Sequence, residues 1–498
     1  YMMIVLLFFT LAACSQTSST TENPDAQTND NNEKTEQANA TEENKNEQPL
    51  QGKLSLSKTS GKIGDTVQLT AENLIPNEPL TVVWKDMVGS YSLEGNYTFI
   101  GSTFEEKEVE LAKGEADENG NWQGEITIPD GFGDDHDILI YQNEKKVAQA
   151  NFFVETVFRI SPESGPVGTE ITIIGEGLSW KMYGSLWHLN YDNKYTGMLT
   201  AVSTNGKAIG KIRAAGKPGK HVITIESGSS GSPFLNRDQS AINYISTHYF
   251  TFTVTDEEPV GERVYVEEPP KAANGGIKLP EPKNKQGVTI TLDKEMGVVG
   301  EPVVLKGEGL PPNETVTLDW HTMVGNRVSS AGFSPEVWKL DEVKTDENGS
   351  FTYEFQIPDD LGGLPHLIDV KVNDEIYGQT YLRILPSVVD ISHPKAEVGT
   401  KLWITIKGSG WTEFDNAYAV TYDNAFIGYA CGFNSQGTIK LPIMVSGEPG
   451  YHLIDIYPTI YKGQQIQPNY YLNPQLTYLE DHPGTNIPPI RIMIEVVQ

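Results

Sequence analysis

Apolar and polar residues alternate over short segments of this chain, and glycine, proline and asparagine separate the segments. The alternation is clear at Leu54–Ser57, Val67–Leu69 and Leu80–Trp84. Successive side chains of a β-strand point to opposite faces of its sheet, so this pattern predicts strands with one buried face. No long segment spaces its apolar residues as a helix does. The sequence therefore predicts an all-β protein.

A glycine turn followed by an alternating strand and a second turn, usually marked by glycine, occurs four times. One copy is Pro166–Leu178, and the others are Ile63–Leu74, Val299–Leu310 and Val398–Trp411. The copies at Ile63–Leu74 and Val299–Leu310 share one set of neighbouring motifs, and those at Pro166–Leu178 and Val398–Trp411 share another. Self-similarity over such distances indicates repeated domains. We infer that a two-domain unit has been duplicated.

The N-terminus carries a short apolar stretch, residues 2–13, followed at once by a polar tract. The stretch is shorter than the ~20 residues that a transmembrane helix needs, and it is typical of an export signal. Basic residues normally precede such a stretch, so we expect a few residues to be missing before Tyr1. Leu11–Cys14 resembles the bacterial lipobox. That resemblance implies cleavage before Cys14 and its acylation with chains such as palmitate, which anchor the protein to a membrane.

Two further segments have the composition of connections. Residues 15–51 are almost all polar, which predicts a disordered stalk, and residues 257–286 are rich in proline, glutamate and lysine, which predicts a semi-extended linker. The chain is too long for one core. The predicted organisation is a lipoprotein signal (1–14), a stalk (15–51), domain 1 (52–155), domain 2 (156–256), the linker (257–286), domain 3 (287–385) and domain 4 (386–498).

Short strands, frequent turns and repeats of about 100 residues are typical of β-sandwiches. We predict an all-β fold with four tandem immunoglobulin-like (Ig-like) β-sandwiches in a duplicated two-domain unit, each with its own core. The phrases Ser161–Gly168, Gly175–Leu178 and Gly219–Ile225 resemble those of bacterial surface Ig-like domains of the IPT/TIG type. Domain 1 departs from this pattern at Ala71–Asn73, where the two glycines are missing.

Charge and cysteine content narrow the range of partners. The formal net charge of −30 argues against nucleic acid, whose phosphates would be repelled, and against direct adhesion to anionic lipid headgroups. The chain has two cysteines, and with Cys14 assigned to lipid, Cys431 has no disulfide partner within the chain. The domains must therefore be held together by core packing, and the apolar neighbours of Cys431 predict a buried strand position for it.

One histidine recurs in every repeat, as His136, His221, His366 and His452. A zinc site needs three or four ligands around one ion, whereas these histidines lie one per domain with no cysteine or second histidine beside them. We predict that they are half-buried and hydrogen-bond to the backbone at the start of a strand. We accordingly expect no metal site and no cofactor.

Two acidic motifs leave calcium as an alternative. Asp134–Asp137 could supply oxygen ligands, but the matching loop of domain 3, Gly362–His366, carries no carboxylate. Asp117–Gly120 and Asp346–Gly349 begin like a calcium loop and lack its later ligands. An Asn-Gly hairpin corner explains both of these motifs without an ion.

The best candidates for binding are aromatic residues in two long connections, Ser227–Tyr244 and Pro458–Pro489. Both exceed the ~12–15 residues of ordinary loops. Such rings can bind sugars or proteins on their flat faces, or they can close over the open end of a sandwich. The candidate binding residues are Phe234, Tyr244, Tyr461, Tyr470, Tyr471 and Tyr478.

The sequence contains no nucleophile elbow, zincin motif, phosphate loop or nucleotide fingerprint, so we expect no enzymatic activity. We expect a non-catalytic, lipid-anchored adhesion or scaffold protein on the extracytoplasmic face of a bacterial membrane, presenting Ig-like domains to a protein partner. The alternative is a carbohydrate-binding lipoprotein that uses the aromatic loops of domains 2 and 4. The expected partners are thus the membrane, through Cys14, and an extracellular protein or glycan.

Overall fold

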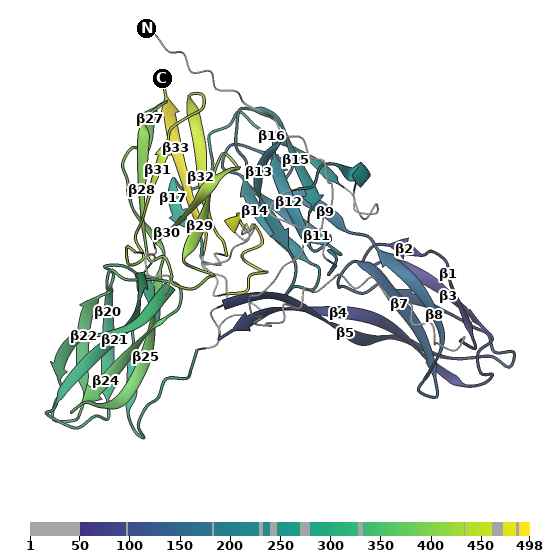
Figure 1. Ribbon diagram of the computed structural model, residues 1–498, viewed down its shortest axis with the longest axis horizontal. Helices are drawn as coiled ribbons and strands as arrows, with labels where there is room; N and C mark the ends of the chain where they lie inside the picture. Colours follow the sequence, from purple (N-terminus) through teal and green to yellow (C-terminus); the bar gives the residue numbers. More distant parts are fainter. Residues whose placement is uncertain are drawn as a thin grey trace, which may run out of the picture. The chain divides into compact units, whose positions relative to one another are not determined.

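The computed structural model describes residues 50–95, 98–181, 184–228, 233–239, 247–268, 279–326, 332–432, 434–460, 472–484 and 488–498. They belong to one compact unit, Leu50–Gln498, shown in Figure 1. Apart from one turn of 3-10 helix at Arg237–Gln239 (η1), the regular elements in these ranges are strands. None of the described segments forms a helix long and apolar enough to cross a membrane. The predicted all-β fold is confirmed.

Within the described ranges the strands form eight sheets, two in each of four β-sandwiches. The predicted tandem Ig-like architecture is therefore confirmed, and the names domain 1 to domain 4 are kept for the four sandwiches. In each of them the repeated phrase begins with a glycine at the turn into a strand. Gly64, Gly168, Gly300 and Gly399 have φ angles of 83°, 90°, 81° and 88°, a region that only glycine adopts without steric cost.

Domain 1 pairs a three-stranded sheet, β1-β3-β6, with a five-stranded sheet, β2-β8-β7-β4-β5. Val67, Leu69 and Ala71 are buried while their neighbours in sequence are not, as alternation requires. The hairpin of β4 and β5 is long, with 16 and 18 residues in its two strands. The strands are β1 (Lys53–Leu56), β2 (Ser60–Gly61), β3 (Thr66–Glu72), β4 (Pro79–Glu94), β5 (Thr98–Glu115), β6 (Trp122–Thr127), β7 (Asp134–Gln142) and β8 (Lys145–Val154).

Domain 2 has the same arrangement, with sheets β9-β11-β14 and β10-β16-β15-β12-β13. Strands β13 and β14 are therefore the edges of its two sheets, on the same side of the sandwich. The strands are β9 (Val157–Ser161), β10 (Ser164–Gly165), β11 (Glu170–Glu176), β12 (Leu186–Tyr191), β13 (Lys194–Thr200), β14 (Ala208–Arg213), β15 (Gly219–Ser227) and β16 (His248–Val254).

Domain 3 repeats domain 1, with sheets β18-β20-β23 and β19-β25-β24-β21-β22. Its β21–β22 hairpin, at 12 and 13 residues, is shorter than the β4–β5 hairpin. The strands are β18 (Thr289–Leu292), β19 (Met296–Val298), β20 (Pro302–Glu308), β21 (Thr315–Asn326), β22 (Gly332–Lys344), β23 (Phe351–Gln356), β24 (His366–Val372) and β25 (Glu375–Leu385).

Domain 4 repeats domain 2 and gains a strand from the linker. Its sheets are β26-β28-β31 and β17-β33-β32-β29-β30, and β27 also pairs with β33. The predicted linker segment 257–286 therefore contributes β17, antiparallel to β33. Cys431 lies in a strand, as predicted, but it is half-buried rather than buried, because β30 is an edge strand. The strands are β17 (Val264–Val266), β26 (Ser387–Ile391), β27 (Lys395–Glu397), β28 (Lys401–Lys407), β29 (Ala417–Tyr422), β30 (Ala425–Cys431), β31 (Ile439–Met444), β32 (Gly450–Pro458) and β33 (Ile490–Val497).

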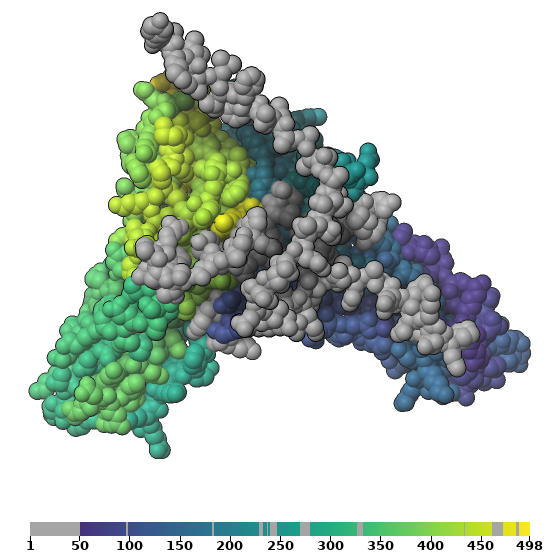
Figure 2. All heavy atoms as spheres, viewed as in Figure 1, coloured from purple at the N-terminus to yellow at the C-terminus, as the bar shows by residue number. Residues whose placement is uncertain are grey.

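The expectation that each sandwich has its own core is wrong for domain 2. Its core cluster includes Tyr457, Leu476 and Tyr478 of domain 4, each 0–1% exposed. Strands β13 and β30 of the two domains pack together, and the two domains lie side by side in Figures 1 and 2. The hydrophobic core of domain 2 thus includes residues that follow the linker in the sequence.

Candidate functional site

The four recurring histidines behave largely as predicted. In domain 1, His136 Nδ1 lies 2.8 Å from the carbonyl oxygen of Lys85, and Nε2 lies 2.9 Å from that of Phe132. His366 of domain 3 makes the matching contacts with the carbonyl oxygens of His321 and Leu361. These rings hold neighbouring segments of their own domain together, and the prediction of backbone hydrogen bonds is confirmed. The two rings are buried rather than half-buried, because each stacks on a core tryptophan, Trp84 or Trp320.

The histidines of domains 2 and 4 have a carboxylate partner that the sequence did not reveal. His221 Nδ1 lies 2.6 Å from Asp192 Oδ2, and His452 Nδ1 lies 2.6 Å from Asp423 Oδ2. Their Nε2 atoms each lie 2.8 Å from a backbone carbonyl oxygen. Burial alone would lower the pKa of His452, but the hydrogen bond to Asp423 raises that pKa above the ordinary value for histidine.

The acidic motifs have protein partners. Asp117 Oδ1 accepts hydrogen bonds from the backbone N–H groups of Asn119 (2.9 Å) and Asn121 (2.8 Å), which closes the hairpin turn. Asp134, only 2% exposed, pairs with Lys181 Nζ at 2.5 Å and with the Ser179 hydroxyl at 2.8 Å. Among the described residues, no three His, Cys, Asp or Glu side chains are grouped so that they could hold a metal ion.

Most of the candidate aromatic residues lie outside the described part of the chain: Tyr244, Tyr461, Tyr470 and Tyr471, together with the proposed lipidation site Cys14. Phe234 is described and is 45% exposed. Tyr478 is 1% exposed, so its ring offers no face to a ligand. It packs into the core that domains 2 and 4 share, and its hydroxyl donates to Glu267 Oε2 at 2.6 Å. For Tyr478 the alternative holds: the ring closes a sandwich.

A buried ionic cluster joins domains 2 and 4. Arg213 of domain 2 donates to Asp455 Oδ1 of domain 4 at 2.8 Å, and the two residues are 3% and 0% exposed. Arg491, 1% exposed, lies 3.2 Å from the same oxygen and 2.7 Å from Glu267 Oε1 of the linker. Every charge in the cluster therefore has an opposite partner, as burial requires.

A second contact ties three domains to one carboxylate. Asp481 of domain 4 is fully buried and accepts hydrogen bonds from the backbone N–H groups of Val202 and Ser203 in domain 2. It also accepts from the Tyr91 hydroxyl of the β4–β5 hairpin at 2.9 Å. Farther along that hairpin, the Phe99 ring meets the Phe414 ring of domain 4 edge to face. The long hairpin thus bridges domain 1 to domain 4.

These contacts close the side of domain 2 on which strands β13 and β14 form its two sheet edges. The backbone N–H of Met198 donates to the Pro474 carbonyl at 2.8 Å, and that of Leu476 donates to the Met198 carbonyl at 2.9 Å. A Cβ added to Gly197 would lie 2.5 Å from the Pro474 carbonyl oxygen, so glycine permits the close approach. The segment around Pro474–Leu476 of domain 4 therefore lies along the edge strand β13 of domain 2 and covers it.

The same side of domain 4, formed by β30 and β31, is open along the first half of β30. From Gly168 to His221, each residue of domain 2 has its counterpart 231 positions later in the sequence. Ile427 and Met444 are 52% and 55% exposed, whereas their counterparts Thr196 and Arg213 are 0% and 3% exposed. A Cβ added to Gly428, the counterpart of Gly197, would meet no atom of the described residues within 4 Å.

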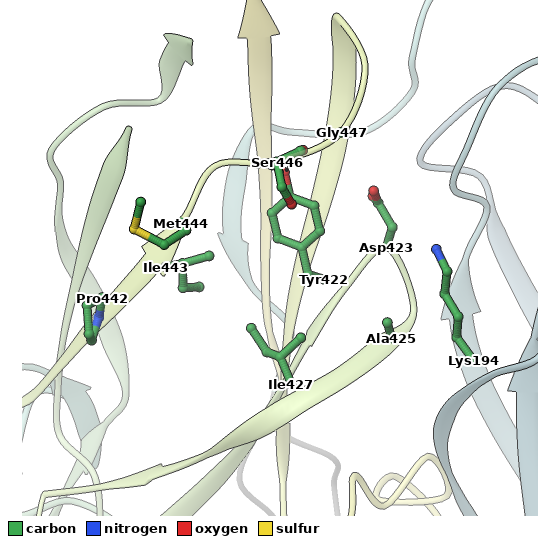
Figure 3. Close-up of a pocket in the computed structure, with 10 residues that line it drawn as sticks. All are labelled: Lys194, Tyr422, Asp423, Ala425, Ile427, Pro442, Ile443, Met444, Ser446 and Gly447. Atoms are coloured by element: carbon green, nitrogen blue, oxygen red, sulfur yellow. Dashed lines mark hydrogen bonds between the residues drawn. The ribbon is translucent and has the colours of Figure 1, made fainter. Parts of the chain in front are cut away.

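The open side forms a groove of about 420 Å³, which we call the domain 4 edge groove. Figure 3 shows Ile427 on β30 facing Pro442, Ile443 and Met444 on β31. Lys194, at the start of β13, lies at one end of the groove. An apolar floor with a charged rim is the composition of a protein-binding surface. This site was not predictable from the sequence, because apolar residues of a strand show the same pattern whether or not a neighbouring domain covers them.

Comparisons with known proteins add no family. No family model matches the sequence, and no curated protein matches it. The tetra-tandem repeat from the extending region of a large adhesion protein superposes with a TM-score of 0.19 and 9% identity, covering 83% of this chain and 96% of that one. The D1–D4 ectodomain fragment of ICAM-5 gives a TM-score of 0.16 and 11% identity, covering 85% and 99%.

A third structure, native Escherichia coli alpha-2-macroglobulin, gives a TM-score of 0.18 and 8% identity, covering 88% of this chain and 31% of that one. TM-scores this low support no conclusion about function. The assignment of the fold rests on the strands and sheets of the chain itself.

Proposed function

We propose that this chain is a non-catalytic cell-surface scaffold or adhesion protein that binds a protein partner through the domain 4 edge groove. The observation that carries the proposal is the exposure of Ile427 and Met444 on two adjacent sheet edges, at positions whose counterparts in domain 2 are buried. Exposed apolar side chains grouped on strand edges are features of protein interaction sites.

The proposed cellular setting comes from the N-terminal sequence. Leu11–Cys14 resembles a lipobox, so we propose an acyl anchor at Cys14, the polar tract 15–51 as a stalk, and sandwiches of the IPT/TIG type displayed on the extracytoplasmic face. The net charge of −30 supports a soluble surface protein that stays clear of anionic headgroups.

Binding of the purified, labelled chain to whole cells of the source bacterium, measured by flow cytometry, tests the proposal. A protein partner predicts that protease treatment of the cells abolishes binding while periodate oxidation of their glycans leaves it intact. Substitution of Ile427 and Met444 by lysine should abolish binding, because two charges would replace the apolar contact.

The alternative, carbohydrate binding by aromatic loops, predicts the reverse sensitivity. It retains one described candidate, Phe234, which is 45% exposed. Binding that survives protease treatment and the Ile427→Lys/Met444→Lys substitution, but is lost after periodate oxidation, would contradict the proposal of a protein partner.

A further inference from the structure

Domains 2 and 4 contact each other through one pair of surfaces, which we call the filled interface. The counterparts of these two surfaces, one on each domain, are exposed. The filled interface joins β14 of domain 2 and the residues that follow it to β32 and β33 on the outer sheet face of domain 4, while β13 packs against β30. On that face Leu453, Arg491 and Met493 are 0–2% exposed. The open counterpart of the edge is the domain 4 edge groove.

The open counterpart of the face lies on domain 2, on strands β15 and β16. The register of the two hairpins places Val222 at the position of Leu453 and Tyr249 at the position of Arg491. Val222 is 42% exposed and Tyr249 is 68% exposed. We call this surface the domain 2 face. It presents Val222 and the Tyr249 ring at two of the positions that domain 4 uses to cover domain 2, and Thr251 at the position of Met493.

The substitutions between the filled and open interfaces match on both sides. The filled interface buries the Arg213–Asp455 ion pair. At the corresponding positions the open groove has Met444 and the open face has Thr224. If only one side had lost its charge, contact between the two open surfaces would bury an unpaired ion at a cost of several kcal/mol. Loss on both sides leaves a contact between methionine and threonine, which carries no such cost.

We propose that the domain 4 edge groove of one molecule binds the domain 2 face of a second copy of this chain, repeating the contact that already joins the two domains. This inference rests on the proposed function and names its partner. Because the two surfaces differ, the contact is heterologous, and each bound pair leaves one groove and one face free. Such contacts build chains of molecules rather than closed dimers.

Two features shape the energetics of the proposed contact. Lys440 is exposed on β31 beside Pro442, and Glu226 occupies the position of Tyr457 on the opposing face, so the contact brings opposite charges onto its two sides. The net charge of −30 on each copy opposes association over a longer range. Salt screens this repulsion and leaves apolar contacts intact, so self-association should strengthen as the ionic strength rises.

The test uses sedimentation velocity on the full chain, with Cys14→Ser in every sample so that no acyl chain drives association. The edge variant carries Ile427→Lys and Met444→Lys, and the face variant carries Val222→Lys and Tyr249→Lys. A control adds the same two charges elsewhere, through Val398→Lys and Ile376→Lys, which replace residues 58% and 39% exposed.

The parent and the control should form species larger than dimers as concentration rises, and each variant alone should associate at least ~100-fold more weakly. An equimolar mixture of the edge and face variants should form a one-to-one heterodimer and nothing larger. Each variant keeps one intact surface, so the heterodimer also shows that both variants are folded.

A parent that stays monomeric up to about 100 μM at high salt would overturn the inference, as would a mixture of the two variants that forms no heterodimer. If the chain is monomeric yet binds cells in a protease-sensitive manner that requires Ile427 and Met444, the proposed function stands and the identity of the partner changes.

Discussion

Domains 2 and 4 share a fold and the residue spacing of a duplicated unit, yet the same side of the sandwich is closed in one and open in the other. In domain 2, Arg213 points from this edge into a buried ion pair, and Met198 pairs its backbone with Pro474 and Leu476. In domain 4, Met444 takes the place of Arg213 and is 55% exposed. A few side chains, together with the domain that packs on them, therefore decide whether this edge is covered. We call the contact between domains 2 and 4 the closed joint.

The comparison also shows where the duplication has diverged. Domain 4 supplies the covering surface through Asp455, Tyr457 and Arg491, whose counterparts in domain 2 are Thr224, Glu226 and Tyr249. The closed joint thus contains buried charged side chains, whereas the open surfaces carry exposed apolar side chains. Buried ion pairs gain their stability only as complete sets, so the two kinds of joint should respond differently to substitution.

The largest expected effect comes from breaking the ionic cluster of the closed joint. Asp455→Thr places the domain 2 residue at this position and leaves Arg213 buried without its carboxylate, so we expect a loss of about 3–5 kcal/mol in the free energy of unfolding. Urea unfolding followed by tryptophan fluorescence measures it.

The matched control is the double variant Asp455→Thr/Arg213→Met, which reproduces the open pair of positions. Because Arg491 keeps Glu267 at 2.7 Å, this variant should recover at least half of the lost stability. A double variant as unstable as the single one would show that the stability of the joint does not depend on charge pairing.

The second effect is a pH dependence located in the loop that closes domain 2. Burial lowers the pKa of His482 to about 4, and its Nδ1 accepts a hydrogen bond from the Gly484 N–H at 3.1 Å. A depressed folded-state pKa means that the unfolded chain, with a pKa near ~6.5, binds the proton more readily. Stability is therefore fully present above about pH 6.5 and is lost as the pH falls toward 4, by about 3 kcal/mol.

Urea midpoints measured from pH 7.5 to pH 4.5 test this expectation, with His482→Gln as the comparison. The variant should show a flatter dependence on pH than the parent, because glutamine does not titrate. Equal slopes in the two proteins would contradict the assignment of this pH dependence to His482.

The fold was largely predictable from sequence, whereas the joint between domains was not. Alternation and recurring glycine turns predicted the four sandwiches, because both patterns follow from local strand and turn geometry. Histidine contacts with the backbone were predictable for the same reason. Their partners Asp192 and Asp423 were missed, because they lie in the turns that follow the neighbouring strands β12 and β29.

Contacts between distant segments leave no periodic signal. Tyr478 was predicted to be a ligand-binding loop residue. Nothing near it in the sequence indicates that its hydroxyl donates a hydrogen bond to Glu267, far earlier in the chain. The long β4–β5 hairpin likewise gave no sign that its Tyr91 would reach Asp481. Such contacts depend on how whole domains pack, which a single sequence does not encode in any local pattern.

A smaller effect is expected from the hydroxyl of Tyr478, which donates to Glu267 and accepts from Arg491 at 3.2 Å. Tyr478→Phe retains the packing in the core of domain 2 and removes both hydrogen bonds. We expect a loss of about 1–2 kcal/mol in the free energy of unfolding, measured by urea unfolding. A change below ~0.5 kcal/mol would mean that the hydroxyl adds nothing to the closed joint.

The smallest effect concerns the two matched histidine–aspartate pairs. The hydrogen bond to Asp423 raises the pKa of His452 above its ordinary value, so its stabilising contribution is complete below the unfolded-state pKa and disappears as the pH rises through the folded-state pKa. His452→Gln should cost on the order of 0.5 kcal/mol at pH 5.5 and less at pH 8.5. The side chain of Asp192 is 38% exposed against 16% for Asp423, and exposed pairs contribute less, so His221→Gln should destabilise the protein less than His452→Gln. Urea midpoints of both variants at the two pH values decide the point, and a cost that grows toward alkaline pH for His452→Gln would reverse the sign assigned to this pair.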